Sequence, residues 1–434
     1  MESNINAPLG AKNNPYANKG YRYYVLGALT TAYAFNFVDR QILAILQEPI
    51  KAELGLSDGQ LGLLTGFAFA MFYVVMGIPI ARIADRGIRR NIIVWAIGIW
   101  SLMTAFCGLA QNFMHLLLAR IGVGVGEAGC SPPAHSMISD IFPPSTRATA
   151  LATYNVGVNI GILVGFMMGG WLHELYGWRV AFYAVGIPGI LLALVFRFTI
   201  KEPQRGYSEG KKQSTDTTPQ PTAKEVITLL WSKRTFRHLM VASSMVAFSG
   251  YGLLNWLPSF LVRSHGLGTG EIGTWLALIA GIGGGIGTFA AGYFADRLGA
   301  RDGRWYVWIS ALGFSIQLPL IITMLLIDNS NAALLCFIIP GALGTIYLAP
   351  VIAVAHSLVE NRMRALASAI VFLIINLIGL GLGPLLVGIV SDLLAPSLGS
   401  ESLRYSLLLL AATAITIGIV HFSLAARTIR EETS

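Results

Sequence analysis

The segment Leu116-Leu-Leu-Ala-Arg-Ile-Gly-Val-Gly-Val-Gly-Glu-Ala128 places two charged side chains, Arg120 and Glu127, inside a long apolar run. Seven residues are close to two helical turns, so both side chains project from one face about 10 Å apart. Charges at membrane depth are costly and normally face a water-filled cavity or a charged partner. Small residues between them would let other helices approach closely: Gly122, Gly124 and Gly126. The segment therefore predicts a membrane helix that carries functional charge.

The same segment contains the spacing Gly-x-Gly-x-x-Gly, at Gly124, Gly126 and Gly129. The dinucleotide-binding fingerprint must follow a strand, open a helix and be trailed by an acid about 20 residues further on. Here the spacing lies inside an apolar run, and the next acid, Asp140, follows Gly129 by only eleven residues. We therefore reject a nucleotide site and expect no cofactor.

Composition assigns the chain to a class. Of its 434 residues, 54% are hydrophobic and only 12% are charged, whereas soluble domains carry about 25% charged residues. Apolar runs of 18 or more residues recur, which predicts an all-α, multi-pass membrane protein. The three cysteines lie within apolar spans without metal-ligand spacing, and we interpret them as packing residues: Cys107, Cys130 and Cys336.

The apolar runs predict twelve transmembrane helices. Six precede a polar interval, at about 22–46, 60–82, 91–110, 113–138, 147–172 and 179–199. Six follow it, at about 237–262, 271–295, 304–327, 332–357, 365–390 and 403–426. An even number of crossings puts both termini on the same side of the membrane.

Basic residues predict the orientation. The side that holds the termini carries 23 of the 30 lysines and arginines, and the opposite side carries four: Lys51, Arg179, Arg263 and Arg404. The positive-inside rule therefore predicts that both termini are cytoplasmic. We expect the protein to lie in the inner membrane of the cell. The pI near 9.4 reflects this topology, so we expect membrane lipids as neighbours and no nucleic-acid partner.

A polar interval divides the chain into three parts. Residues 201–222 are predicted to form a flexible linker, and Ala223 to Trp231 an amphipathic segment at the cytoplasmic interface. We therefore predict an N-terminal six-helix bundle at 1–200, a cytoplasmic linker at 201–236 and a C-terminal six-helix bundle at 237–434.

An internal repeat supports this division. Ala81-Arg-Ile-Ala-Asp85-Arg86-Gly-Ile-Arg89-Arg90 follows the second predicted helix, and Gly292-Tyr-Phe-Ala-Asp296-Arg297-Leu-Gly299-Ala-Arg301 follows the eighth. One copy alone is typical of a solvated basic loop. Two Ala-Asp-Arg copies at equivalent positions indicate the internal repeats from which secondary transporters are built.

These motifs resemble the major facilitator superfamily, whose signature after helix 2 is Gly-x-x-x-Asp-Arg-x-Gly-Arg-Arg. The second copy departs from it at Ala300, while the first has Ala81 at the leading glycine and Gly87 one place early. Asn36-Phe-Val-Asp39-Arg40-Gln41, together with Arg120 through Glu127-Ala128, is similar to the spinster group of lipid transporters in its bacterial form. The resemblance implies alternating access by two bundles. It also implies cytoplasmic gating contacts by the motif residues Asp85, Arg86, Arg89, Arg90, Asp296, Arg297 and Arg301.

Four intramembrane charges form the candidate site: Asp39, Arg40, Arg120 and Glu127. The first helix runs outward and the fourth inward, which puts Asp39 and Arg120 at nearly equal depth and Glu127 about 10 Å deeper. Arg40 is able to reach either carboxylate or line the cavity. The four charges sum to zero, which lowers the cost of burial. A static ion pair between helices 1 and 4 is the alternative interpretation, but intramembrane ionisable groups are functional by default.

The second half offers no charge in the central parts of its helices. A cavity between the bundles would be charged on one wall and largely apolar on the other, with polar groups lining it: Asn36, Tyr251, Asn255, Tyr347 and Asn376. We therefore expect a monomeric, proton-coupled secondary transporter of an amphipathic, lipid-like anion, either antiporter or symporter. The alternatives are transport of another small organic anion or a drug, and a non-transporting receptor. We expect no enzymatic activity, because the sequence contains no nucleophile–base or metal cluster and no phosphate-binding loop.

Overall fold

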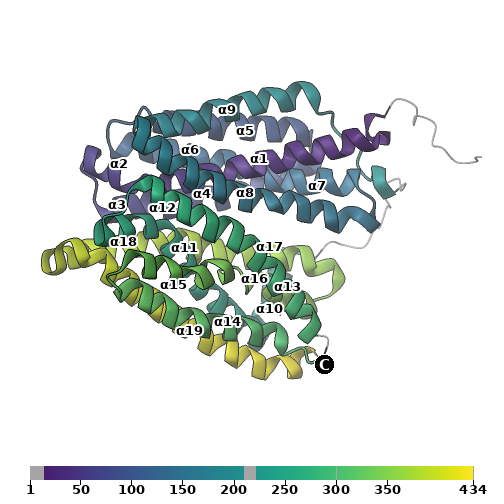
Figure 1. The fold of residues 1–434 in the computed structure, drawn as a ribbon. Helices are drawn as coiled ribbons and strands as arrows, with labels where there is room; N and C mark the ends of the chain where they lie inside the picture. Colours follow the sequence, from purple (N-terminus) through teal and green to yellow (C-terminus); the bar gives the residue numbers. More distant parts are fainter. Residues whose placement is uncertain (1–13, 210–220, 300, 434) are drawn as a thin grey trace, which may run out of the picture.

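The computed structural model describes residues 14–209, 221–299 and 301–433 (Figure 1). Every regular element in these residues is a helix. Part of the predicted linker, residues 210–220, lies outside the described residues, as does the polar N-terminal stretch 1–13. The described start of the linker, 201–209, follows the first group of helices and ends in the short helical turn Tyr207–Glu209.

The helices fall into two halves in chain order. The first half consists of α1 (Lys19–Ile45), α2 (Gln47–Leu54), α3 (Asp58–Gly62), η3 (Leu63–Phe67), α4 (Ala68–Arg86), α5 (Arg89–Cys107), α6 (Phe113–Glu127), α7 (Ser131–Ile141), α8 (Pro144–Tyr176) and α9 (Trp178–Thr199). The second half consists of α10 (Ala223–Ser232), α11 (Arg234–His265), α12 (Thr269–Leu276), η5 (Ala277–Gly283), α13 (Gly284–Gly299), α14 (Trp305–Leu326), α15 (Ser330–Leu343), α16 (Leu348–Ser357), α17 (Arg364–Ile375), η7 (Asn376–Leu382), α18 (Gly383–Leu398) and α19 (Ser402–Thr433).

In the described part of the chain, ten helical runs are long and apolar enough to cross a membrane. One of them, Asn361–Ile429, is 69 residues long and contains α17, α18 and most of α19. The ten do not include α1, which is 27 residues long and carries Asp39 and Arg40 in its second half. The multi-pass helical class is therefore confirmed, while the count of twelve and the cytoplasmic termini stay predictions.

Two predicted helices are interrupted in the structure. The helix expected at 113–138 breaks after Glu127, where turns at 128–130 separate α6 from α7. Pro132 and Pro133 follow this break and lack the N–H groups that would continue the hydrogen-bond ladder. The helix expected at 332–357 is also interrupted, because α15 ends at Leu343 and turns at 344–347 separate it from α16. Glu127 therefore ends a helix, where sequence periodicity predicted a helix interior.

Glycines allow α1 and α8 to pack with their backbones in contact. They recur every fourth residue along one face of α8: Gly157, Gly161, Gly165 and Gly169. A Cβ added at Gly161 would lie 2.4 Å from the carbonyl oxygen of Ala34, and one at Gly157 would lie 2.6 Å from that of Thr30. Such small-residue stripes are a common basis of helix association in membranes, because lipid tails supply no hydrophobic drive between helices.

The two halves form two groups of helices that lie side by side (Figure 1). The start of α1 and the end of α19 lie at one end of the molecule, called here the terminal end, and α2 and α3 lie at the opposite or far end (Figure 1). Helices of different halves meet through α8 with α12 and η5, through α18 with α3 and η3, and through η7 with α4. The amphipathic segment forms α10, whose Val226 and Leu230 are buried while Trp231 is exposed.

Candidate functional site

Asp39 and Arg120 meet across the interface between α1 and α6. The Arg120 guanidinium donates from Nη1 to Asp39 Oδ1 at 3.4 Å, and the exposed fractions of the two side chains are 2% and 1%. The other carboxylate oxygen of Asp39 accepts a hydrogen bond from the hydroxyl of Thr104 on α5. Three helices therefore contribute to one buried polar contact, and both oxygens of Asp39 have donors.

Arg40 turns to the second carboxylate, Glu127. Its Nε donates to Glu127 Oε2 at 2.8 Å, and Nη2 lies 2.8 Å from the same oxygen. Aromatic rings surround the guanidinium, with centroids 4.8, 4.7 and 5.1 Å from its carbon: Phe37, Phe69 and Tyr73. Cation–π contacts of this kind stabilise a cation that has lost part of its hydration.

The two ion pairs differ in exposure. The Arg40 side chain keeps 14% of its surface accessible, whereas Glu127 keeps none and the Asp39–Arg120 pair almost none. An incoming group therefore reaches Arg40 more easily than Arg120. The geometry divides the four predicted residues into a locked pair, Asp39–Arg120, and a pair with one accessible member, Arg40–Glu127.

Three buried polar atoms at the site have no hydrogen-bond partner: Asn36 Oδ1, Arg120 Nε and Glu127 Oε1. Buried polar groups are normally paired with protein or water, and leaving one unpaired costs about 1–3 kcal/mol. The orphan atoms include both a donor and two acceptors. The site therefore has capacity to bind water, a proton or a polar group of a ligand.

The structure distributes the predicted lining residues of the second half over several elements. Tyr251 of α11 packs against a group of buried apolar side chains that contains Phe69, the ring of which lies over the Arg40 guanidinium. Asn255, one turn further on, donates to the carbonyl of Tyr251 at 3.0 Å. Tyr347 is buried against Phe314, at the break between α15 and α16, and Asn376 begins η7. Tyr251 is thus the lining residue that the structure brings to the charged wall.

Among the predicted gating residues, Arg89 is fully buried, and its guanidinium binds several polar groups at the terminal end. It pairs with Asp140 of α7, donates from Nε to Glu202 at 2.8 Å, and donates from Nη1 to Ser136 at 2.7 Å. The backbone N–H of Arg90 donates to the same Glu202. This network ties the start of the linker to the first half.

Four of the other gating residues lie on the surface: Asp85, Arg86, Arg297 and Arg301. Asp85 and Arg86 are exposed at the end of α4, Arg301 is exposed after α13, and Arg297 donates to Tyr293 of its own helix at 3.2 Å. The side chain of Asp296 is outside the part of the structure that is described. The contacts described for these motif residues therefore lie within their own half or with the start of the linker.

Thr104 is the site residue that sequence reasoning missed. A hydroxyl in an apolar helix carries no charge signal, and its role depends on the contact between α5 and α1. Two histidines within apolar segments have local partners: His135 packs edge-on against Tyr154, and a ring nitrogen of His356 lies 2.7 Å from the Ser368 hydroxyl. In the described chain, no three His, Cys, Asp or Glu side chains are grouped to hold a metal ion.

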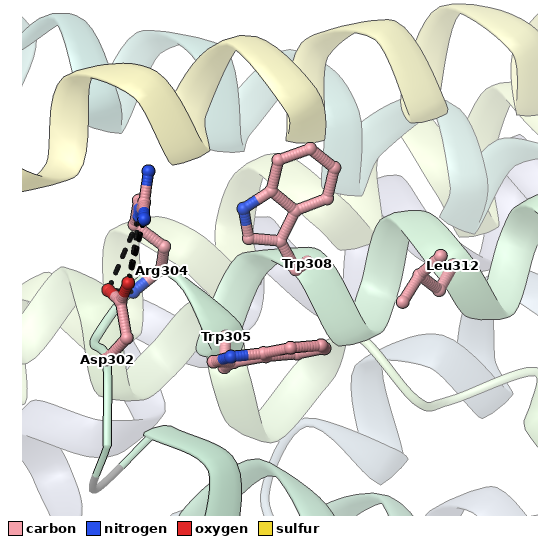
Figure 2. A pocket seen from close by; sticks show the side chains of 5 residues that line it. All are labelled: Asp302, Arg304, Trp305, Trp308 and Leu312. Atoms are coloured by element: carbon pink, nitrogen blue, oxygen red, sulfur yellow. Dashed lines mark hydrogen bonds and ion pairs between the residues drawn. The ribbon is translucent and has the colours of Figure 1, made fainter.

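A separate cavity of about 260 Å³ lies at the start of α14 (Figure 2). Figure 2 shows the residues that line it, among them Trp305, Trp308 and Arg304, whose guanidinium pairs with Asp302 at 2.9 Å. This cavity shares no residue with the four intramembrane charges. We therefore take the charges, and not this cavity, as the candidate transport site.

The family model described as the Major Facilitator Superfamily matches residues 29–384. The chain belongs to the Major Facilitator Superfamily. This confirms the family predicted from the two Ala-Asp-Arg copies, and it makes the chain a membrane transporter by family.

Individual relatives narrow the comparison. The chain is 34% identical to the MFS-type efflux pump of Mycolicibacterium smegmatis, over 99% of both proteins. It is 27% identical to the protein spinster of Drosophila melanogaster, over 86% of this chain and 62% of the fly protein. A crystal structure titled as a bacterial homologue of the human lysosomal transporter Spinster, inward-facing and unoccupied, superposes with a TM-score of 0.87. That homologue is 34% identical, over 96% of this chain and 99% of its own. The predicted likeness to the spinster group is confirmed.

Proposed function

We propose that this protein is a proton-coupled secondary transporter of an amphipathic, lipid-like anion, of the lysophospholipid or sphingosine-phosphate type. The observation that carries the proposal is the Arg40–Glu127 pair, in which a buried carboxylate holds a partly accessible arginine. An arginine released from such a pair binds a phosphate headgroup through two parallel hydrogen bonds. Protonation of Glu127 neutralises the carboxylate and releases Arg40, and the anion then binds Arg40 in place of the carboxylate.

The opposite wall supports an apolar part of the substrate. The second-half helices carry no Asp, Glu, Lys or Arg in their central portions, and Tyr251 and Leu380 pack against first-half side chains near Arg40. A headgroup on Arg40 would leave the tail of the substrate against these helices. This arrangement suits an amphipathic substrate better than a sugar.

Alternating access is carried by two six-helix bundles, 1–200 and 237–434, joined by the cytoplasmic linker 201–236. The hydrogen bonds and ion pairs described between the halves all lie at the far end, for example Ser259 with Gln47 and Trp171 with Thr274. This distribution supports a state open toward the terminal end, which the positive-inside rule makes the cytoplasm. The crystal structure of the bacterial spinster homologue with the same fold is in an inward-facing conformation.

A second candidate is export of another small organic anion or a drug. The 34% identity to an MFS-type efflux pump over the full length favours it. The two candidates share the transport mechanism and differ in the substrate. A non-transporting receptor, the third alternative, would use the same fold without net flux.

Reconstituted uptake separates these candidates. The purified chain in liposomes is given a fluorescent lysophospholipid, a sphingoid phosphate, a short dicarboxylate or a cationic dye, with and without an imposed pH gradient. We expect the two phosphate-bearing amphiphiles to accumulate and the pH gradient to drive the accumulation. Accumulation of the dye or dicarboxylate alone would assign the second candidate, and no flux of any compound would assign the third.

A further inference from the structure

Two joints with the same backbone geometry close the far end. At the first joint, the helical run that begins at Asp58 packs on α18, and a Cβ added at Gly388 would lie 2.2 Å from the carbonyl oxygen of Asp58. At the second, the run that begins at Thr269 packs on α8, and a Cβ added at Gly170 would lie 2.2 Å from the carbonyl oxygen of Thr269. Each joint therefore places a glycine of one half against the backbone of the other.

The two joints also have the same close backbone contact one turn further along each pair of helices. A Cβ at Gly62 would lie 2.4 Å from the carbonyl oxygen of Pro384, and one at Gly273 would lie 2.3 Å from that of Phe166. Pro384 precedes Gly388 by four residues, and Phe166 precedes Gly170 by four residues. Any side chain at these positions would separate the halves, so the joints require glycine for close approach.

Each joint also contains a helix cap supplied by the opposite half. Asp392 accepts the backbone N–H groups of Asp58 at 3.0 Å and Gly59 at 2.7 Å. Glu174 accepts the N–H of Gly270 at 3.0 Å. Both carboxylates stand four residues after their joint glycine. The first N–H groups of a helix lack partners within the helix, and an acid there also interacts favourably with the helix dipole.

The sequence repeats the capped segments. Leu56-Ser-Asp-Gly-Gln-Leu-Gly62 and Leu267-Gly-Thr-Gly-Glu-Ile-Gly273 share the pattern Leu-x-x-Gly-x-x-Gly. The distance along the chain between these copies equals that between Asp85 and Asp296 in the Ala-Asp-Arg repeat. The two joints are therefore copies of one device, related by the same internal repeat.

The two joints differ in the charged residues that they contain. Arg263 donates to both carboxylate oxygens of Asp58 at 2.7 Å, and the Ser391 hydroxyl donates to Asp58 at 2.6 Å. At the second joint Thr269 replaces the acid, and its hydroxyl lies 2.9 Å from the ring of His173. The first joint is thus fixed by an ion pair between the halves, while the second depends on neutral contacts and the cap from Glu174.

We propose that Asp392 and Glu174 are the two latches of the far-end gate, each holding the gate shut by capping a helix of the opposite half. Because the capping carboxylate and the capped N–H groups belong to different halves, separating the halves at the far end breaks both caps. The proposal rests on the alternating-access function proposed above, since a gate has meaning only in a transporter. It goes beyond that function by naming residues remote from Arg40 and Glu127 that set the balance between the two open states.

The test uses a buried reporter between the halves. Ser259 is 1% exposed, and its hydroxyl contacts Gln47 of the first half. In a background lacking the three native cysteines, Ser259→Cys is reacted with a polar maleimide in lipid nanodiscs, where both ends are accessible. We expect Asp392→Asn and Glu174→Gln each to speed labelling about 3–10-fold, as the loss of one cap implies, and the double variant to speed it by the product. The matched control is Asp328→Asn, because Asp328 pairs with Arg404 inside one half; it should leave the rate unchanged.

Unfolding is monitored separately with Cys107, which is fully buried inside the first half. A variant that retains Cys107 alone should stay unlabelled if the fold is intact. If either neutral variant exposes Cys107, the test is repeated with Glu174→Asp and Asp392→Glu. These variants keep the negative charge but change the length of the side chain by one methylene, and we again expect faster labelling at position 259. Unchanged labelling in folded variants would overturn the proposal. The assay needs no substrate, so failure of the transport proposal would appear instead in liposome flux.

Discussion

Arg40 and Glu127 form a 2.8 Å ion pair that joins α1 to α6 at the point where α6 ends. Glu127 is fully buried, yet one of its carboxylate oxygens has no hydrogen-bond partner. A carboxylate that satisfies one oxygen and leaves the other open is suited to gaining and losing a proton. The neighbouring Asp39 has donors on both oxygens and is suited to holding the site together.

Removing one member of the Asp39–Arg120 pair should abolish transport. Either Asp39→Asn or Arg120→Gln leaves the partner as an uncompensated charge in a low-dielectric site, which costs about 3–5 kcal/mol of stability. Flux in liposomes and thermal unfolding in detergent measure the two effects. If Asp39→Asn transports normally at every pH, the pair has no working role.

The charge swap is the control for this pair. Asp39→Arg combined with Arg120→Asp restores the opposite charges at the same depth, so folding and surface expression should recover. Activity need not recover, because Thr104 would then face an arginine. A swap that folds no better than the single variants would show that the geometry around Thr104, and not charge balance, decides stability.

Thr104 should prove to be a positioning residue for Asp39. Thr104→Val keeps the shape and removes the hydroxyl, which leaves one buried carboxylate oxygen unpaired at a cost of about 1–3 kcal/mol. Thr104→Ser retains the donor and should restore most of the stability. We expect the pH dependence of substrate flux to differ between the valine variant and the unmodified protein, measured in liposomes over a range of pH. An identical pH profile in both variants would leave Thr104 with a packing role only.

The α1–α8 contact should tolerate no side chain at Gly161. A Cβ there would lie 2.4 Å from Ala34 O and 2.5 Å from Phe37 Cβ, so Gly161→Ala should destabilise the chain by about 1–3 kcal/mol despite the better helix propensity of alanine. Gly27→Ala on α1 is the matched control, because nothing lies within 4 Å of its added Cβ. The control should be neutral or slightly stabilising. Equal melting temperatures for both variants would contradict the close packing of these helices.

The orientation in the membrane is tested by single-cysteine labelling in intact cells, in a background without the native cysteines. A cysteine introduced in the linker at Ser214 should react only after the cells are permeabilised. Cysteines near Lys51 and Arg263, such as at the exposed Ala52, should react with an impermeant reagent from outside. Labelling of the linker in intact cells would reverse the predicted topology and move the terminal end to the outside.

The class and the family could be predicted from the sequence, because long apolar runs and the Ala-Asp-Arg repeat are visible along the chain. The four intramembrane charges were singled out in the same way, and their role in transport stays a prediction. Apolar runs mark membrane helices, and an arginine or carboxylate inside such a run is conspicuous. Equal depth along antiparallel helices predicted that Asp39 and Arg120 could meet, and the structure brings them to 3.4 Å. Arg40 pairs with Glu127 because of the rotamer that its side chain adopts, and the spacing of residues in the sequence does not predict that rotamer.

Contacts between the halves could not be predicted in this way. The caps from Asp392 and Glu174 join residues that are far apart along the chain, and an acid near a helix end is usually solvated. The repeat of Leu-x-x-Gly-x-x-Gly at Leu56 and Leu267 was a usable signal, because it shares its spacing with the Ala-Asp-Arg repeat. The break after Glu127 was also marked, by the adjacent Pro132 and Pro133.

The central claim, that Glu127 couples protons to the substrate, is tested most directly by Glu127→Gln in liposomes with a pH difference imposed across the membrane. Glutamine mimics the protonated acid, so Arg40 loses its counter-ion and remains available to an anionic headgroup. We predict that this variant still binds substrate and exchanges it downhill, while the pH difference no longer drives accumulation. Full gradient-driven accumulation by Glu127→Gln would contradict the account and leave Asp39 as the remaining carboxylate candidate.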